Sequence, residues 1–85
     1  MSKVSVDTSL TEALVCKAPT LEIGIRIRSE LIHASSFCWF FLYSQSCELY
    51  VTNEFGGRIK QETLEFLQAK AQEILDAIAK ESLPS

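Results

Sequence analysis

The side chains that could perform chemistry in this chain are few, with one His and three Cys among 85 residues. A Cys–His enzyme needs a thiol and an imidazole within hydrogen-bond reach, and His33 could serve Cys38 or Cys47. Both cysteines stand in apolar stretches, where a thiol behaves as a small hydrophobic group, and His33 falls in an expected turn. We therefore predict no catalytic residue and no enzymatic activity.

Metal and cofactor motifs are equally scarce. The chain contains no C-x-x-C, no H-x-x-x-H and no EF-hand loop. Gly56-Gly57 ahead of a helix, with Arg58 and Lys60 nearby, could attract a phosphate, but no phosphate-loop or dinucleotide fingerprint accompanies them. We interpret the glycines as a plain helix entry, and Glu62 and Glu65 as solvated charges. No metal and no cofactor is predicted.

The most informative feature is the uninterrupted apolar run from Phe37 to Tyr43. On a strand it divides into Phe37, Trp39, Phe41 and Tyr43 on one face and Cys38, Phe40 and Leu42 on the other. Helices can cover only one of these faces, so the other should form an exposed aromatic patch, and such patches mark interaction sites. With side chains expected on the neighbouring strands, the candidate interaction surface is Arg26, Arg28, Trp39, Phe41 and Tyr50.

Which of the two sets faces outward depends on the length of the following turn. A three-residue turn at Ser44–Ser46 would place Trp39 beside Val51, whereas a two-residue turn would place Trp39 beside Tyr50. A shift of one residue exchanges the two faces, and both registers stay open at this point.

Three further patterns predict the elements that position this strand. Ser9-Leu10-Thr11-Glu12 is a capping box, which indicates a short helix from Leu10 to about Lys17 before Pro19. The alternative is a loop with Leu14 tucked into the core. Alternation of apolar residues from Leu21 to Ile27 predicts a half-buried strand that extends to about Leu31.

The C-terminal half continues with a strand at 47–52, a loop at 53–57 and a helix from about Arg58 to Lys80. The helix has a clear apolar stripe, formed by Leu64, Leu67, Ala71, Ile74, Leu75 and Ile78. Phe66 lies off this stripe, and we expect the N-terminal segment or another chain to cover it.

Together these elements predict a single α+β domain over residues 1–85. A short N-terminal helix, a three-stranded antiparallel sheet and a long amphipathic C-terminal helix on one sheet face follow each other in α-β-β-β-α order. Residues 1–8 would form a disordered arm, and 82–85 a tail.

Charge and cysteine content narrow the function. A net charge of -3 and a pI of about 5.0 argue against nucleic acid, although Arg26 and Arg28 beside aromatics could stack on single-stranded RNA. An odd number of cysteines argues against a disulfide framework, and the N-terminus does not resemble a signal peptide. The longest apolar run is far shorter than the roughly 20 residues of a membrane-spanning helix. We expect a cytoplasmic protein without a membrane partner.

The favoured hypothesis is a small protein-interaction module, of the adaptor, inhibitor or immunity type, that forms a homodimer through its apolar sheet face. The N-terminal segment or a different protein could cover that face instead. The alternative function is a small-molecule-binding module, with Trp39 or Tyr50 as the wall of an aromatic pocket between the sheet and the C-terminal helix.

Overall fold

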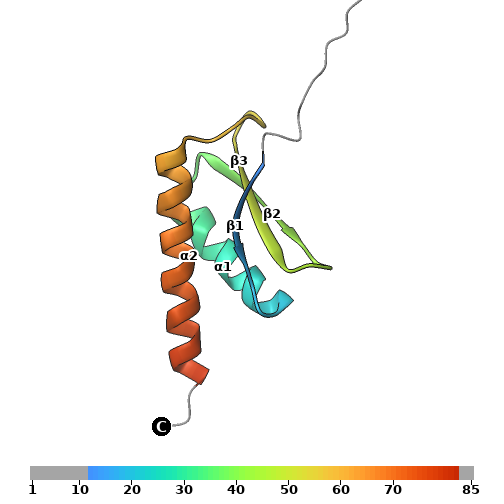
Figure 1. The fold of residues 1–85 in the computed structure, drawn as a ribbon, viewed down its shortest axis with the longest axis vertical. Coiled ribbons are helices and arrows are strands. Elements are labelled where there is room, and N and C mark those ends of the chain that lie inside the picture. The colour runs from blue at the N-terminus through green and yellow to red at the C-terminus, as the bar shows by residue number, and fades with distance from the viewer. Residues whose placement is uncertain (1–11, 83–85) are drawn as a thin grey trace, which may run out of the picture.

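The computed structural model describes residues 12–82, which form a three-stranded antiparallel sheet with two helices on one face (Figure 1). The elements are β1 (Ala13–Lys17), α1 (Leu21–Ala34), β2 (Cys38–Tyr43), β3 (Glu48–Asn53) and α2 (Gln61–Ser82). The strands lie in the order β1-β3-β2. The α+β class, the antiparallel sheet and the C-terminal helix packed on it are confirmed. The predicted arm at 1–8 and the tail beyond Ser82 lie outside the described residues.

The first two elements are exchanged relative to the prediction, so that the chain runs β-α-β-β-α. Residues 13–17 form a strand and not the end of a helix, and most of the capping box falls outside the described residues. β1 pairs antiparallel with β3, with Leu14 opposite Tyr50 and a bulge before Cys16. A two-turn helix has little stability of its own, whereas pairing with β3 satisfies the backbone and buries Val15.

The second correction concerns the segment that begins at Leu21, which is a helix and not a strand. Thr20 caps it, because its hydroxyl accepts a hydrogen bond from the Ile23 N–H at 3.2 Å. Along α1 the buried positions are Gly24, Ile27 and Leu31, which follow helical spacing. The alternation that suggested a strand ends at Ile27, and the helical pattern continues beyond it.

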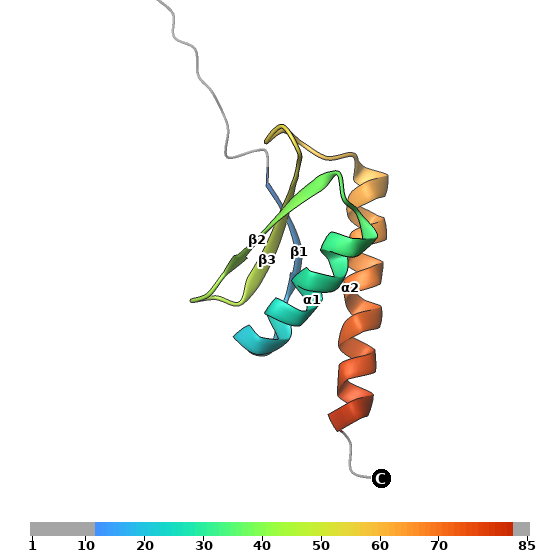
Figure 2. The ribbon, with the colours of Figure 1, turned by 180° about the vertical axis from the view of Figure 1, so that it is seen from behind.

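The C-terminal helix agrees with the predicted phase. Leu67, Ala71, Ile74 and Ile78 are buried, and Leu64 and Leu75 pack partly buried against the same cluster. Figure 2 shows α2 beside α1, and both helices contribute to one core with the inward residues of the sheet. The domain therefore has one hydrophobic core, which lies between the layer of two helices and the sheet.

The β2–β3 hairpin adopts neither of the two predicted registers. Trp39 lies opposite Thr52, and Phe40 lies opposite Val51. The connection is one residue longer than the longer predicted turn, because Cys47 adopts a left-handed conformation with φ of 57°. Its N–H returns to the Tyr43 carbonyl at 2.8 Å, which removes Cys47 from the strand. This register turns Phe40 toward the helices and Trp39 away from them.

Candidate interaction surface

The sheet face opposite the helices gathers large apolar side chains from all three strands. We call Leu14, Trp39, Phe41, Tyr43 and Tyr50 the outer aromatic face. Trp39 is 55% exposed, Leu14 and Tyr43 are each 43% exposed, and Phe41 is 37% exposed. On the other side of the same strand Phe40 is only 4% exposed. The structure therefore brings together three of the five residues predicted for the interaction surface, namely Trp39, Phe41 and Tyr50.

The two tyrosines of this face are held by one another and by acidic side chains. Their rings lie 5.1 Å apart between centroids and are tilted by 51°. The Tyr43 hydroxyl donates to both carboxylate oxygens of Glu12, at 2.9 and 3.1 Å. The Tyr50 hydroxyl donates to Glu48 at 3.2 Å. These contacts fix the phenol rings and place two carboxylates at the rim of the face.

The same contacts raise the pKa values of the two phenol groups. The pKa of Tyr43 is raised, first by its hydrogen bond to Glu12 and then by desolvation. The pKa of Tyr50 is raised first by desolvation and then by its hydrogen bond to Glu48. Both shifts keep the hydroxyl groups protonated, so each phenol remains a hydrogen-bond donor across the range of ordinary pH.

The two arginines of the predicted surface lie elsewhere, because they belong to α1 and not to a strand. Arg26 donates to both carboxylate oxygens of Glu81, at 3.0 and 2.9 Å, and its Nε lies 3.8 Å from Glu30. The hydrogen bond to Glu81 raises the pKa of Arg26, and the hydrogen bond from Arg26 lowers the pKa of Glu81. Arg26 therefore ties α1 to the end of α2, away from the outer aromatic face.

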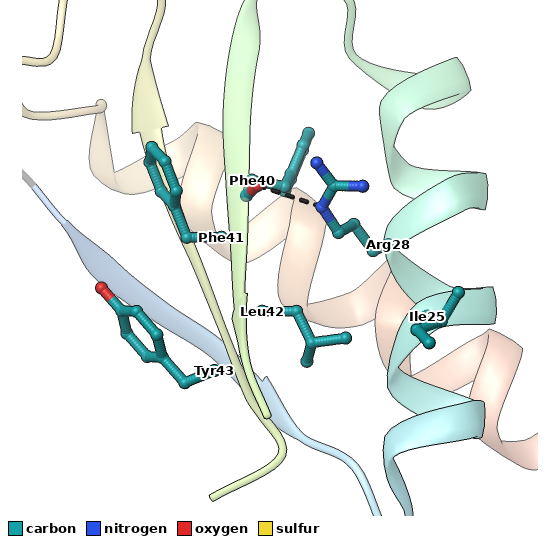
Figure 3. Close-up of a pocket in the computed structure, with 6 residues that line it drawn as sticks. All are labelled: Ile25, Arg28, Phe40, Phe41, Leu42 and Tyr43. Atoms are coloured by element: carbon teal, nitrogen blue, oxygen red, sulfur yellow. Dashed lines mark hydrogen bonds between the residues drawn. The ribbon is translucent and has the colours of Figure 1, made fainter. Parts of the chain in front are cut away.

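Arg28 has a different position, at the free edge of the sheet. Its Nε donates to the Phe40 carbonyl at 3.1 Å (Figure 3). Two grooves flank it along β2. One, of about 360 Å³, is lined by Ile25, Arg28, Phe40, Phe41, Leu42 and Tyr43. The other, of about 340 Å³, is lined by Arg28, Ile32, Cys38, Trp39, Phe40 and Phe41.

Sequence reasoning missed this edge site, since it placed Arg28 on a strand. The spacing of Ile25, Arg28 and Ile32, three and four residues apart, is the signal that would have put them on one helical face. In Figure 3, Ile25 and Leu42 lie on the two sides of the gap between α1 and β2, while Phe41 and Tyr43 point to the other side of the sheet.

The residues considered for catalysis are engaged locally. The Ser35 hydroxyl donates to Cys38 Sγ at 3.3 Å, and Cys47 Sγ lies 4.0 Å from the Ser44 carbonyl. His33 lies in the last turn of α1, exposed, and not in a connecting turn. Burial raises the pKa of the Cys16 thiol. Over residues 12–82 no group of three or more His, Cys, Asp or Glu side chains is arranged to hold a metal ion.

The glycine pair does not open the C-terminal helix, contrary to our interpretation. Gly56 has φ of 79° in a turn organised by Asn53, whose Oδ1 accepts from the N–H groups of Phe55 and Gly57, both at 2.8 Å. Asn53 Nδ2 donates to the Arg58 carbonyl at 3.0 Å, and α2 begins only at Gln61. The N–H of Gly57, which an anion would need, is therefore already used.

The aromatic pocket that the sequence suggested between the sheet and α2 is not found there in the part of the chain that the structure describes. Trp39 and Tyr50 both lie on the outer face, and the space toward α2 is filled by fully buried Leu49, Val51 and Leu67. Those side chains belong to the core.

Comparison of the chain with protein-family models, with curated proteins and with solved structures found no match. Within residues 12–82, neither helix combines the length and apolar character needed to cross a membrane. The functional argument therefore starts from the outer aromatic face and the β2 edge.

Proposed function

We propose that this domain is a cytoplasmic protein-interaction module that self-associates through its outer aromatic face. The observation that carries the proposal is the division of β2. On its inner side Phe40 is buried and Cys38 and Leu42 are partly buried, while Trp39, Phe41 and Tyr43 are exposed together on the outer side. Apolar area left in water forgoes about 25 cal/mol of stabilisation per Å². A second copy that covers the patch recovers it.

The size of the patch suits the centre of an interface. Aromatic side chains bury about 150–250 Å² each when fully covered, so the exposed fractions here amount to roughly 300–400 Å². A stable dimer buries about 800 Å² per partner. The aromatic residues would supply the apolar core of such a contact, and the polar residues around them would supply the rim.

The rim carries charges of both signs, which favours a second copy as the occupant. Lys17 ends β1 opposite Glu48, and Glu12 stands just before the start of the same strand. In a contact across a two-fold axis, Lys17 of one copy can face Glu12 or Glu48 of the other, since the same patch is used twice. Arg26, which the sequence placed on the interaction surface, is instead hydrogen-bonded to Glu81.

The test compares two exposed aromatic residues of equal accessibility. Trp39 is 55% exposed on the outer face, and Phe66 is 54% exposed on α2. We expect the wild-type chain to sediment as a dimer at micromolar concentration, the Trp39→Ser variant as a folded monomer, and the Phe66→Ser variant as a dimer. A wild-type chain that remains monomeric over a hundredfold concentration range, or a dimer that survives Trp39→Ser unchanged, contradicts the proposal.

A further inference from the structure

The two edges of the sheet are protected to different extents. At the β1 edge, Gln68 of α2 donates to the Leu14 carbonyl at 2.9 Å, and α2 packs along the strand. At the β2 edge, within residues 12–82, the Phe40 carbonyl accepts a hydrogen bond only from the Arg28 side chain, and the Cys38 N–H donates to the Ser35 carbonyl at 3.5 Å. Because backbone groups alternate along a strand, Leu42 directs its N–H and carbonyl to the same free edge as Phe40. Within residues 12–82, no strand pairs with this edge of β2, so its backbone groups can accept an added strand.

Beside this edge, α1 presents a row of three exposed side chains. Ile25 is 55% exposed and Ile32 is 38% exposed, with Arg28 between them. Ile25 faces Leu42 across one groove, Arg28 contacts the Phe40 carbonyl, and Ile32 lines the other groove together with Cys38. A strand added at the β2 edge would rest on an apolar residue, then a cation, then a second apolar residue.

The positive charge of Arg28 determines which kind of strand the β2 edge can accept. Arg28 is exposed, and no carboxylate pairs with it in the part of the chain that the structure describes. If two β2 strands paired about Phe40, their two Arg28 side chains would meet near the axis, and like charges opposite each other destabilise a strand pair. A strand that carries a carboxylate at this position would instead gain a charge-assisted hydrogen bond.

We propose that the β2 edge binds an extended segment of another protein by strand addition, and that this segment has the pattern apolar-x-acidic-x-apolar. Residues opposite Leu42, Phe40 and Cys38 share one face of an added strand, because side chains alternate with a period of two. The two apolar residues rest on Ile25 and Ile32, and the acidic residue meets Arg28. The α1 side chains that would contact this segment lie on the opposite side of the sheet from Phe41 and Tyr43 of the outer aromatic face, which would carry self-association.

The experiment uses the full chain and three synthetic probes. The first is acetyl-Thr-Val-Thr-Glu-Thr-Val-Thr-amide, and the others carry Gln or Lys in place of Glu. We expect the Glu peptide to shift the backbone amide resonances of Phe40 and Leu42 and to bind about tenfold more tightly than the Gln peptide. The Lys peptide should bind most weakly.

Two variants on the same helix serve as a matched pair. Arg28→Gln should abolish the preference for Glu over Gln, whereas Arg26→Gln, with the same change of charge, should retain it. The proposal is overturned by equal affinity for the Glu and Gln peptides, by no shift at millimolar peptide, or by shifts confined to Trp39, Tyr43 and Tyr50. Repeating the titration on Trp39→Ser separates the two proposals, since edge binding does not require the outer aromatic face.

Discussion

The two faces of β2 carry side chains of the same chemical kind and meet opposite surroundings. Phe40 is buried against the core formed by α1, α2 and the sheet, whereas Phe41, the next residue, lies on the outer aromatic face. Hydrophobicity alone therefore does not decide burial in this domain. The register of the hairpin decides which aromatic ring meets the helices, and the other ring remains available to a partner.

The largest expected effect separates these two phenylalanines. Phe40→Ala should lower the free energy of unfolding by about 3–5 kcal/mol, because it leaves a cavity in the core. Phe41→Ala should cost clearly less in the monomer and should weaken self-association. Chemical denaturation at low protein concentration measures the free energy of unfolding of both variants. Equal losses for the two variants would mean that the two faces are equally packed.

The second effect concerns the helix that covers the inner face. Leu67→Ala and Ile74→Ala should each cost about 2–5 kcal/mol, since both side chains are buried. Glu73→Ala, on the exposed side of α2 beside Lys70, should cost less than about 0.5 kcal/mol. Urea unfolding of the three variants checks the phase of the helix, and a ranking with Glu73→Ala as the most harmful would contradict it.

The contrast between α2 and α1 shows how much of the fold the sequence could predict. The stripe of α2 extends over the whole helix with a helical period, so its existence and its phase are both confirmed. In α1 the four apolar residues Leu21, Ile23, Ile25 and Ile27 alternate with other residues, and within that short window the pattern fits a strand as well as a helix. The cap at Thr20 and the apolar Leu31 favour the helix, but both lie outside the stretch from Leu21 to Ile27. They become evidence only when the whole segment from 20 to 34 is considered.

β1 and the edge site were out of reach for a different reason. β1 is a strand because it pairs with β3, which is distant in the sequence, while the local capping box favours a helix. The contact between Arg28 and the Phe40 carbonyl depends on the assignment of α1 and on the strand order together. The aromatic patch was predictable, since any strand with two apolar faces leaves one of them uncovered by a single layer of helices.

The smallest expected effect lies away from both faces of β2, at the ion pair between Arg26 and Glu81. The pKa of Glu81 is lowered by Arg26, so this contact stabilises the fold above the ordinary pKa of glutamate, about 4.3. Its contribution is lost as the pH falls through the lowered pKa. Unfolding of wild type and Glu81→Gln across pH should show a small difference near neutrality that shrinks in acid and in high salt. A difference that grows in acid would contradict the assignment.

The most direct test of self-association through the outer aromatic face uses Trp39, the single tryptophan of the chain, as a reporter on that face. Its fluorescence emission can be followed over a dilution series from about 100 μM to 0.1 μM, alongside the sedimenting mass, because dimers dissociate by mass action. The account predicts an emission maximum that moves to longer wavelength as the mass falls from dimer to monomer, with one midpoint for both signals. A halving of the mass with unchanged emission would place the contact elsewhere on the molecule and contradict the account.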